Sequence, residues 1–160
     1  MSVKIASALV AVSLGLLGTA GCQWSEDRFL KREVAPEELA GSWVLRAESV
    51  RDLDSIGVEL GKDRFSHWLE LESDGGCELQ TFLPADVELT GSPPAVTSSR
   101  CRWELRQGAA RQQLWLELLD APGKHVHYNF TETSGGELVI WQYIGDPDAW
   151  RYLEYSKEES

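Results

Sequence analysis

The chain has 160 residues, with 15 Lys and Arg against 26 Asp and Glu, a formal net charge of -11 and a sequence pI near 4.7. This length suits one domain rather than two. The acidic surface repels phosphate backbones, and no run of basic residues supplies the positive footprint that nucleic-acid binding normally needs. These features exclude nucleic acid as a partner.

The start of the chain differs in kind from the rest. Lys4 is the only charged residue in 1–21, and it precedes a largely apolar run over 5–17. This arrangement is typical of a secretory signal peptide. The run is too short to cross a bilayer core of about 30 Å, which needs roughly 20 apolar residues in a helix. We therefore expect a cleaved signal over 1–21 rather than a spanning anchor.

The signal ends in a short segment of small residues and leucines. Residues 16–22 read LLGTAGC. This segment resembles the lipobox of bacterial lipoproteins, in which small residues precede a Cys that is acylated and becomes the mature N-terminus. The resemblance implies lipidation of Cys22, by palmitate among other acyl chains, and an envelope protein. Gln23 follows the Cys, and a residue other than Asp there implies the periplasmic side of the outer membrane in Gram-negative bacteria. The alternative is an ordinary export signal with Cys22 as a bystander.

Residues 22–34 are predicted to form a solvated tether. They mix charged residues with the isolated aromatics Trp24 and Phe29 and show no sustained period. Trp24 suits a membrane interface. Removal of the signal removes Lys4 and leaves 14 basic against 26 acidic side chains, which gives the mature chain a charge of -12.

Two short helices are predicted at the start of a single body over 35–160. Pro36 suits the first position of a helix and Gly41 suits the residue past its end, so 36–40 is expected to form one helical turn. Farther on, a capping residue at Ser49 precedes apolar residues at helical spacing, which predicts a second helix that continues to about residue 60.

The rest of the body predicts eight short strands. Runs rich in β-branched, aromatic and Leu residues are separated by turn sequences at close intervals. Their expected ranges are 42–48, 65–72, 77–83, 100–106, 113–119, 125–132, 138–144 and 150–157. The glycine pairs in 74–76 and 134–136 provide the positive φ that tight turns need. Only the connection over 84–99 is long, and an extra short strand is predicted around 87–89.

Alternation within the strands indicates which faces are buried. Cys101 and Trp103 alternate with Arg100 and Arg102, and a similar alternation runs through 125–130. One face of each strand is therefore apolar and the other wet. Eight such antiparallel strands can bury one face in a closed barrel or in a two-sheet sandwich. The hairpin-length connections favour an all-β, eight-stranded antiparallel up-and-down barrel.

A family resemblance enters at the first strand. Residues 39–43 read LAGSW and place a Gly-x-Trp motif directly after the predicted helical turn. This segment is similar to the first motif of lipocalins and other calycins. The resemblance implies a lipocalin-like barrel in which Gly41 and Trp43 form a structural plug at one end, under Arg151 or Lys157 from the last strand. It also implies a small hydrophobic ligand inside the barrel.

Cys77 and Cys101 are the only thiols left after lipidation of Cys22, and an exported compartment tends to oxidise them. If the strands over 77–83 and 100–106 form a simple hairpin, however, the two thiols lie at its opposite ends. Their Cα atoms are then farther apart than the limit of about 7 Å for a disulfide. A bend in the long connection removes the conflict, so a disulfide and two buried free thiols both stay open.

The histidines and tryptophans allow a functional and a structural interpretation. His125 and His127 share a strand face and His67 is the only other imidazole, but no third ligand has a recognisable spacing, so we predict a wet strand face and no metal site. Tryptophans can stack on sugars or line a cavity. We instead expect those inside predicted strands to fill the core. These are Trp43, Trp68, Trp103, Trp115 and Trp141.

No strong catalytic motif is present. The chain lacks a Gly-x-Ser-x-Gly segment, a phosphate-binding loop and a metalloprotease helix. Asp146 and Asp148 flank a Pro and are better explained by a turn than by paired catalytic carboxylates. We therefore expect a binding protein without enzymatic activity or cofactor, whose ligand is a small hydrophobic molecule. The alternative is a protein-interaction or inhibitor module of the cell envelope without a ligand cavity, which the acidic charge favours.

Overall fold

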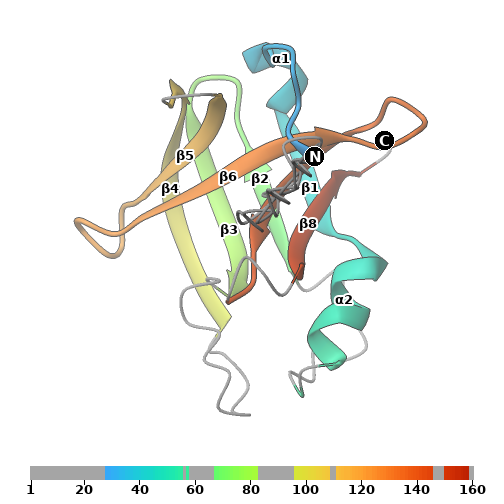
Figure 1. Cartoon of the computed structure of the whole chain (residues 1–160). Helices are drawn as coiled ribbons and strands as arrows, with labels where there is room; N and C mark the ends of the chain where they lie inside the picture. The colour runs from blue at the N-terminus through green and yellow to red at the C-terminus, as the bar shows by residue number, and fades with distance from the viewer. Residues whose placement is uncertain are drawn as a thin grey trace, which may run out of the picture.

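The chain folds into a closed β-barrel. The structure, a computed structural model, describes residues 28–55, 57, 67–82, 96–108, 111–145 and 150–158. Each strand pairs antiparallel with its neighbours in sequence, and the last pairs with the first (Figure 1). The strands are β1 (Gly41–Leu45), β2 (Trp68–Leu71), β3 (Gly76–Phe82), β4 (Val96–Gln107), β5 (Gln112–Leu118), β6 (His125–Glu132), β7 (Leu138–Tyr143) and β8 (Tyr152–Lys157). The predicted all-β, eight-stranded up-and-down barrel is confirmed.

One helix precedes β1 and a second helix follows it. In α1 (Pro36–Leu39), the Glu38 carboxylate accepts the backbone N–H of Ala35 at 2.8 Å, which satisfies a donor at the start of the helix. The second helix, α2 (Ala47–Asp54), lies against β8. No helix of the described residues is long and apolar enough to cross a membrane.

Helix α2 differs from the prediction in its start. It begins before Ser49, so this residue lies inside the helix and does not cap it. Ser49 is buried, and its hydroxyl accepts the backbone N–H of Glu154 at 2.8 Å. Tertiary contact with β8 therefore uses the side chain that the local pattern assigned to a cap. The predicted continuation toward residue 60 lies largely outside the described residues.

The strand limits agree with the prediction except at two places. Strand β1 ends at Leu45 rather than at residue 48, because the chain turns directly into α2. Strand β4 begins at Val96 rather than at residue 100, because it pairs with the whole length of β3. All other limits lie within three residues of the predicted ones. The extra strand predicted around 87–89 lies outside the described residues.

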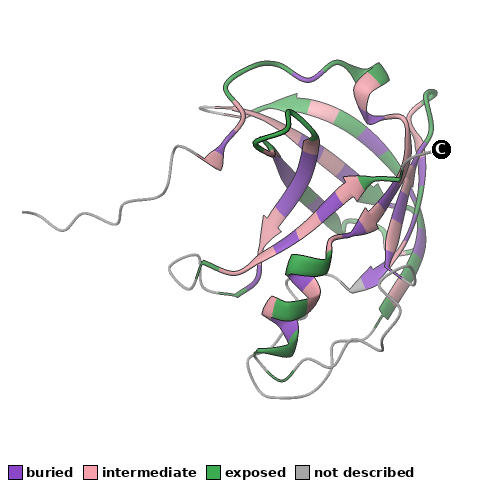
Figure 2. Cartoon of the chain, turned by 90° about the vertical axis from the view of Figure 1, so that its right-hand side faces the viewer, coloured by how far each residue is buried: buried purple, intermediate pink, exposed green. Residues whose placement is uncertain are grey.

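Inward-facing side chains form one continuous core inside the barrel. The alternation of buried and exposed positions can be followed along the strands in Figure 2. The core includes large rings as well as leucines, and none of its residues is more than 9% exposed. The largest fully buried side chains that face the interior include Trp43, Tyr128, Tyr155, Leu45, Leu69, Leu79 and Leu114. An eight-stranded barrel is just wide enough for side chains to fill.

The prediction that five strand tryptophans fill the core is right for some of them only. The buried ones are Trp43, Trp103 and Trp141. Trp141 lies on the outer side of β7, where Phe29 covers it with the two ring centroids 5.0 Å apart. Trp68 and Trp115 are half-buried, because each occupies an outward position next to inward-facing leucines. For these two residues the prediction was wrong.

Trp43 lies at the α1 end of the barrel. Its ring is fully buried, and its indole N–H donates to the carbonyl of Leu39 at 2.8 Å. Leu39 itself is fully buried at the end of α1. The ring therefore joins the helical turn to the core.

The last strand covers this end of the barrel with a lysine. Lys157 pairs with Trp43 across the β1–β8 ladder, and its ammonium donates to the carbonyl of Glu38 at 3.1 Å. Gly41 has a φ of 126°, and a Cβ there would lie only 2.9 Å from Cε of Lys157. Of the two basic residues considered for this position, Lys157 occupies it, whereas Arg151 lies at the opposite end of β8. Only glycine fits beside the lysine.

The segment over 28–34, which we call the N-terminal strap, packs on the outside of the barrel. Phe29 and Val34 are buried. The N–H of Leu30 donates to the carbonyl of Phe130 at 2.9 Å, and the N–H of Val34 donates to the side-chain oxygen of Gln112 at 2.7 Å. This part of the chain differs from the solvated tether expected over 22–34, because it covers apolar side chains and satisfies its backbone on β5 and β6. Residues 22–27 lie outside the described part.

Removal of the Trp43 ring should destabilise the barrel strongly. We expect Trp43→Ala to lower the free energy of unfolding by about 3 to 5 kcal/mol, because it leaves a cavity and an unpaired carbonyl at Leu39. Urea unfolding followed by circular dichroism measures this change. Trp150→Ala is the matched control, since that ring is 54% exposed, and its unfolding midpoint should stay close to that of the wild type. Equal midpoints for the two variants would show that Trp43 is not a plug.

Candidate functional site

Several polar side chains of the described strands face the barrel interior, and four of them lie among the rings and leucines of the core: Thr81, Tyr128, Gln142 and Tyr155. The hydroxyls of Thr81 and Tyr155 are hydrogen-bonded at 2.7 Å, and the ring of Tyr128 meets that of Tyr155 edge-on with centroids 5.9 Å apart. The Tyr128 hydroxyl lies near that of Tyr155 but has no well-formed hydrogen bond within the described structure. The side-chain oxygen of Gln142 is also buried without a partner there. Buried polar atoms are normally satisfied, so this interior has spare hydrogen-bonding capacity.

Burial controls the titration of the two interior tyrosines. Burial raises the pKa of Tyr128 well above its ordinary value, and the neighbouring Tyr155 phenol raises it further. Burial also raises the pKa of Tyr155, although its hydrogen bond to Thr81 and the nearby Tyr128 hydroxyl act in the opposite direction. Both phenols stay neutral in the folded barrel.

The barrel should lose stability in alkali. In the unfolded chain the phenols ionise near pH 10. Their pKa is higher in the folded barrel, so stability is complete below about pH 10 and falls as the pH rises further. Urea unfolding across this range measures the fall. We expect Tyr128→Phe to keep or raise stability at neutral pH, because it removes an unpartnered hydroxyl, and to reduce the alkaline loss. An unchanged slope against pH would contradict this explanation.

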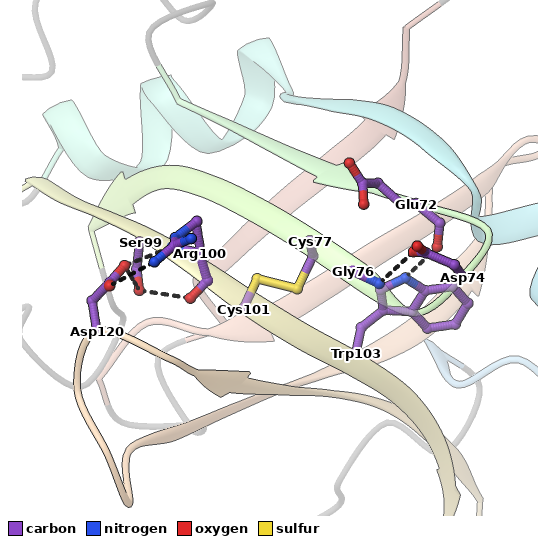
Figure 3. Close-up of a disulfide and its surroundings, with 9 residues drawn as sticks. All are labelled: Glu72, Asp74, Gly76, Cys77, Ser99, Arg100, Cys101, Trp103 and Asp120. Atoms are coloured by element: carbon purple, nitrogen blue, oxygen red, sulfur yellow. Dashed lines mark hydrogen bonds and ion pairs between the residues drawn. A yellow bond between two sulfur atoms is a disulfide. The ribbon is translucent and has the colours of Figure 1, made fainter.

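A disulfide joins β3 to β4. Cys77 and Cys101 are directly opposed in the ladder, with Cα atoms 4.8 Å apart, and both are buried (Figure 3). The geometric objection to this bridge came from starting β4 at residue 100. Because β4 starts at Val96, the hairpin closes four residues earlier and brings the two cysteines side by side.

Both sides of the disulfide are held by hydrogen bonds (Figure 3). On one side, the indole and backbone N–H groups of Trp103 donate to the carbonyls of Glu72 at 2.8 Å and Gly75 at 2.9 Å. On the other side, the Asp120 carboxylate accepts the backbone N–H of Arg100 at 2.9 Å, which lowers the pKa of Asp120. The bridge therefore lies in a rigid part of the wall and is structural in role.

Loss of the disulfide should destabilise the protein without opening the barrel. The bridge closes a segment between residues separated by 24 positions, for which chain entropy predicts about 3 kcal/mol. We expect the Cys77→Ala/Cys101→Ala double variant to lose about that much free energy of unfolding in urea. The double variant should keep the circular dichroism spectrum of the wild type. The control is the wild type unfolded under reducing conditions, which should have the same midpoint as the double variant. If reduction does not change the midpoint of the wild type, the assignment of the disulfide is contradicted.

The outer side of β7 and β8 carries a cluster of aromatic rings around one arginine. The rings of Trp141, Tyr143 and Tyr152 have centroids 5.0 to 5.5 Å apart. The guanidinium of Arg28 lies 3.6 Å from the ring centroid of Tyr152 and 4.9 Å from that of Trp141, and it forms an ion pair with Glu154. Burial lowers the pKa of Arg28, although nearby phenols oppose this effect. The contacts combine cation–π attraction with a shielded ion pair.

The two strand histidines lie on the outer face beside Trp115, and only His127 stacks on its ring, whereas His125 is tilted with centroids 6.3 Å apart. His127 is parallel to Trp115 with centroids 5.4 Å apart, and the guanidinium of Arg106 lies 4.5 Å from the Trp115 centroid. His125 borders an open hollow of about 670 Å³ beside them. Elsewhere, His67 is buried and its carbonyl accepts a backbone N–H from β1. Within the described ranges, no three metal-binding side chains gather.

A second hollow, which we call the acidic hollow, lies on the outer face of β1, β2 and β3. It has a volume of about 360 Å³ and combines carboxylates with apolar side chains. Glu70 and Glu78 are directly opposed across the β2–β3 ladder. On its other side Glu78 is opposed by Arg100, whose guanidinium pairs with Asp120 instead, and no ion pair of Glu70 or Glu78 is seen among the described side chains. Ser42 donates to Glu70. Trp68 and Val44 add apolar surface to this hollow.

Several residues singled out in the sequence lie outside the described part of the chain. These are Cys22, Trp24, Asp146 and Asp148. The sequence reasoning missed the Arg28 cluster and the acidic hollow. The acidic hollow could have been found from the sequence, because Trp68, Glu70 and Glu78 occupy outward-facing positions of their strands. The Arg28 cluster could not, because the sequence of the strap shows no hydrophobic periodicity.

Comparisons of the chain with protein-family models, with curated proteins and with solved structures find no match. The fold alone therefore defines the class: an eight-stranded antiparallel up-and-down β-barrel with a plugged end and an N-terminal strap.

Proposed function

We propose that this protein is exported, anchored in the cell envelope by acyl chains on Cys22, and works by binding another molecule without chemistry of its own. The signal-like run over 1–21 and the lipobox resemblance support the anchor. The barrel supports a binding role, because its described side chains make a solid core with polar groups on the outside. The acidic hollow is the surface that best fits a partner.

The opposed pair of carboxylates carries this proposal. Glu70 and Glu78 face each other across neighbouring strands, where like charges destabilise a sheet by about 0.2 to 1 kcal/mol. A basic partner would remove that repulsion on binding. Trp68 beside them supplies the large apolar contact typical of interface hot spots. The charge of -12 expected for the mature chain would also accelerate encounter with a basic protein.

A binding measurement with a basic lysozyme as the probe tests the acidic hollow. We expect Glu70→Gln/Glu78→Gln to weaken binding about tenfold, in line with loss of close charge contacts. The matched control is Glu33→Gln/Glu117→Gln, which changes the net charge equally at exposed positions outside the hollow. Its affinity should change by less than about twofold. Equal losses in both double variants would show that only net charge matters and would contradict a specific site.

The repulsion itself predicts a gain in stability. We expect Glu78→Gln to raise the free energy of unfolding by about 0.2 to 1 kcal/mol, because the neutral amide no longer repels Glu70. Thermal unfolding measures this shift. Glu117→Gln is the control. Like Glu78, which lies opposite Arg100, Glu117 lies opposite an arginine, Arg102, but its other ladder partner is His125 rather than a carboxylate, so it should not gain stability when neutralised. A loss of stability in Glu78→Gln would mean that the attraction between Glu78 and the opposed Arg100 outweighs its repulsion from Glu70, and would contradict the prediction.

The second candidate function is a small, mostly apolar ligand inside the barrel, as the lipocalin resemblance implies. The buried Tyr128 hydroxyl and Gln142 oxygen support it, because polar groups on such a ligand could pair with buried atoms that have no partner in the described structure. Native mass spectrometry of the protein purified from its own host tests this. A retained small mass that disappears in Tyr128→Phe would favour the ligand over the acidic hollow.

A further inference from the structure

The large apolar side chains exposed on the described surface gather at one end of the barrel. They are Val96, Leu119 and Trp150, and each is 45 to 54% exposed. Val96 begins β4, Leu119 directly follows β5, and Trp150 lies two residues before β8. Because neighbouring strands run in opposite directions, these three positions belong to the strand ends opposite α1. We call them the apolar rim.

The strap directs its N-terminal end toward this rim. Arg28, its first residue, lies over the ring of Tyr152, which is the first residue of β8. Val34, its last residue, bonds to Gln112 at the first position of β5, near α1. The strap therefore runs from the rim end to the plugged end. The chain that precedes Arg28 starts at the rim.

The distance available between the anchor and the barrel is short. Six residues, 22–27, separate Arg28 from the start of the mature chain, and a fully extended chain spans at most about 3.6 Å per residue. Cys22 therefore lies within about 22 Å of Arg28. This is roughly half the length of β4, whose 12 residues rise about 3.3 Å each. A free spacer from Cys22 to Val34 would reach farther than this, so the packing of the strap over 28–34 shortens the distance between the anchor and the barrel.

We infer that the apolar rim rests on the headgroup region of the membrane that holds the anchor. The inference depends on the proposed acylation of Cys22. Tryptophan is enriched at membrane interfaces, where its ring is apolar and its N–H is wet. Trp150 has a φ of 56°, a backbone conformation that residues other than glycine rarely adopt, and its side chain is 54% exposed. Lys124 and Arg151 lie in turns at the same end, where they can reach lipid phosphates.

The net negative charge of the protein favours a zwitterionic lipid surface over an anionic one. A chain with 26 acidic side chains is repelled from strongly anionic bilayers, so contact at the rim has to come from apolar insertion into a mostly zwitterionic headgroup layer. The acyl chains hold the protein at the surface, and the rim sets which end points down. A second copy of the chain is the competing occupant of the rim, and the experiment separates the two.

The test uses the full acylated protein in vesicles of phosphatidylethanolamine with brominated acyl chains. Cys22 is acylated and Cys77 is bridged to Cys101, so an introduced cysteine is the only free thiol. An environment-sensitive fluorophore is attached at Trp150→Cys. The matched control carries it at Ser134→Cys, an exposed turn position at the α1 end. We expect emission at 150 to shift to the blue and to be quenched about twofold or more, and emission at 134 to stay unchanged.

Two further variants make the outcomes distinct. Leu119→Ser keeps the fold and should reduce quenching at 150, because the rim loses apolar surface. Arg28→Ala frees the strap from Tyr152 and should bring quenching at 150 and 134 closer together. Equal quenching at the two sites in the wild type, or quenching that follows dimer formation rather than lipid, would overturn the rim assignment alone. Intact mass without acyl chains on Cys22 would overturn the proposed anchor and this inference together.

Discussion

The pairing of β1 with β8 is the contact on which the rest of the structure depends. Only three residue pairs stand in register there, Trp43 with Lys157, Val44 with Ser156 and Leu45 with Tyr155. One backbone bond extends the ladder at each end, from Arg46 to Glu154 at 2.9 Å and from Glu158 to Ser42 at 2.8 Å. Without this seam the sheet would have two open edges and an uncovered apolar face. The plug, the interior hydroxyl pair and α2 all attach to seam residues.

The outside of the barrel reinforces this seam. Arg28 from the strap and Arg46 from the end of β1 both contact the carboxylate of Glu154 on β8. One shielded carboxylate thus joins three segments that are far apart in sequence. The aromatic rings beside Glu154 also hold the strap, because contact with the ring faces offsets part of the cost of removing the Arg28 guanidinium from water. The seam and the strap therefore stabilise each other, and the direction of the strap follows from where the seam lies.

Much of the fold could be predicted from local pattern. Period-two alternation identified the inward faces of β4 and β6, and the turn glycines fixed most hairpins, since both signals act over a few residues. What failed depended on tertiary context. Trp68 and Trp115 are apolar residues at outward positions. Their strands are apolar at most positions, so the sequence does not show which face points outward. Ser49 looked like a cap because its partner on β8 lies 105 residues away.

The candidate sites were less accessible to prediction than the fold. The strap has no period, so nothing local distinguishes a packed segment from a solvated one, and only the aromatic cluster on β7 and β8 explains its position. The prediction for the disulfide stayed open because the start of β4 was placed four residues too late. The acidic hollow depended on the register of β2 against β3, which brings Glu70 opposite Glu78. Register is a property of pairing that a single strand sequence does not contain.

The solid interior explains why the two proposed surfaces lie where they do. A barrel of eight strands holds side chains with little room to spare, so binding capacity shifts to its ends and its outer faces. One end is closed by Trp43 and Lys157, whose polar atoms are satisfied by α1. The other end keeps exposed apolar side chains. The acidic hollow lies on the outer wall rather than at either end, so a barrel standing on its rim would still present the hollow to a partner in the surrounding solution.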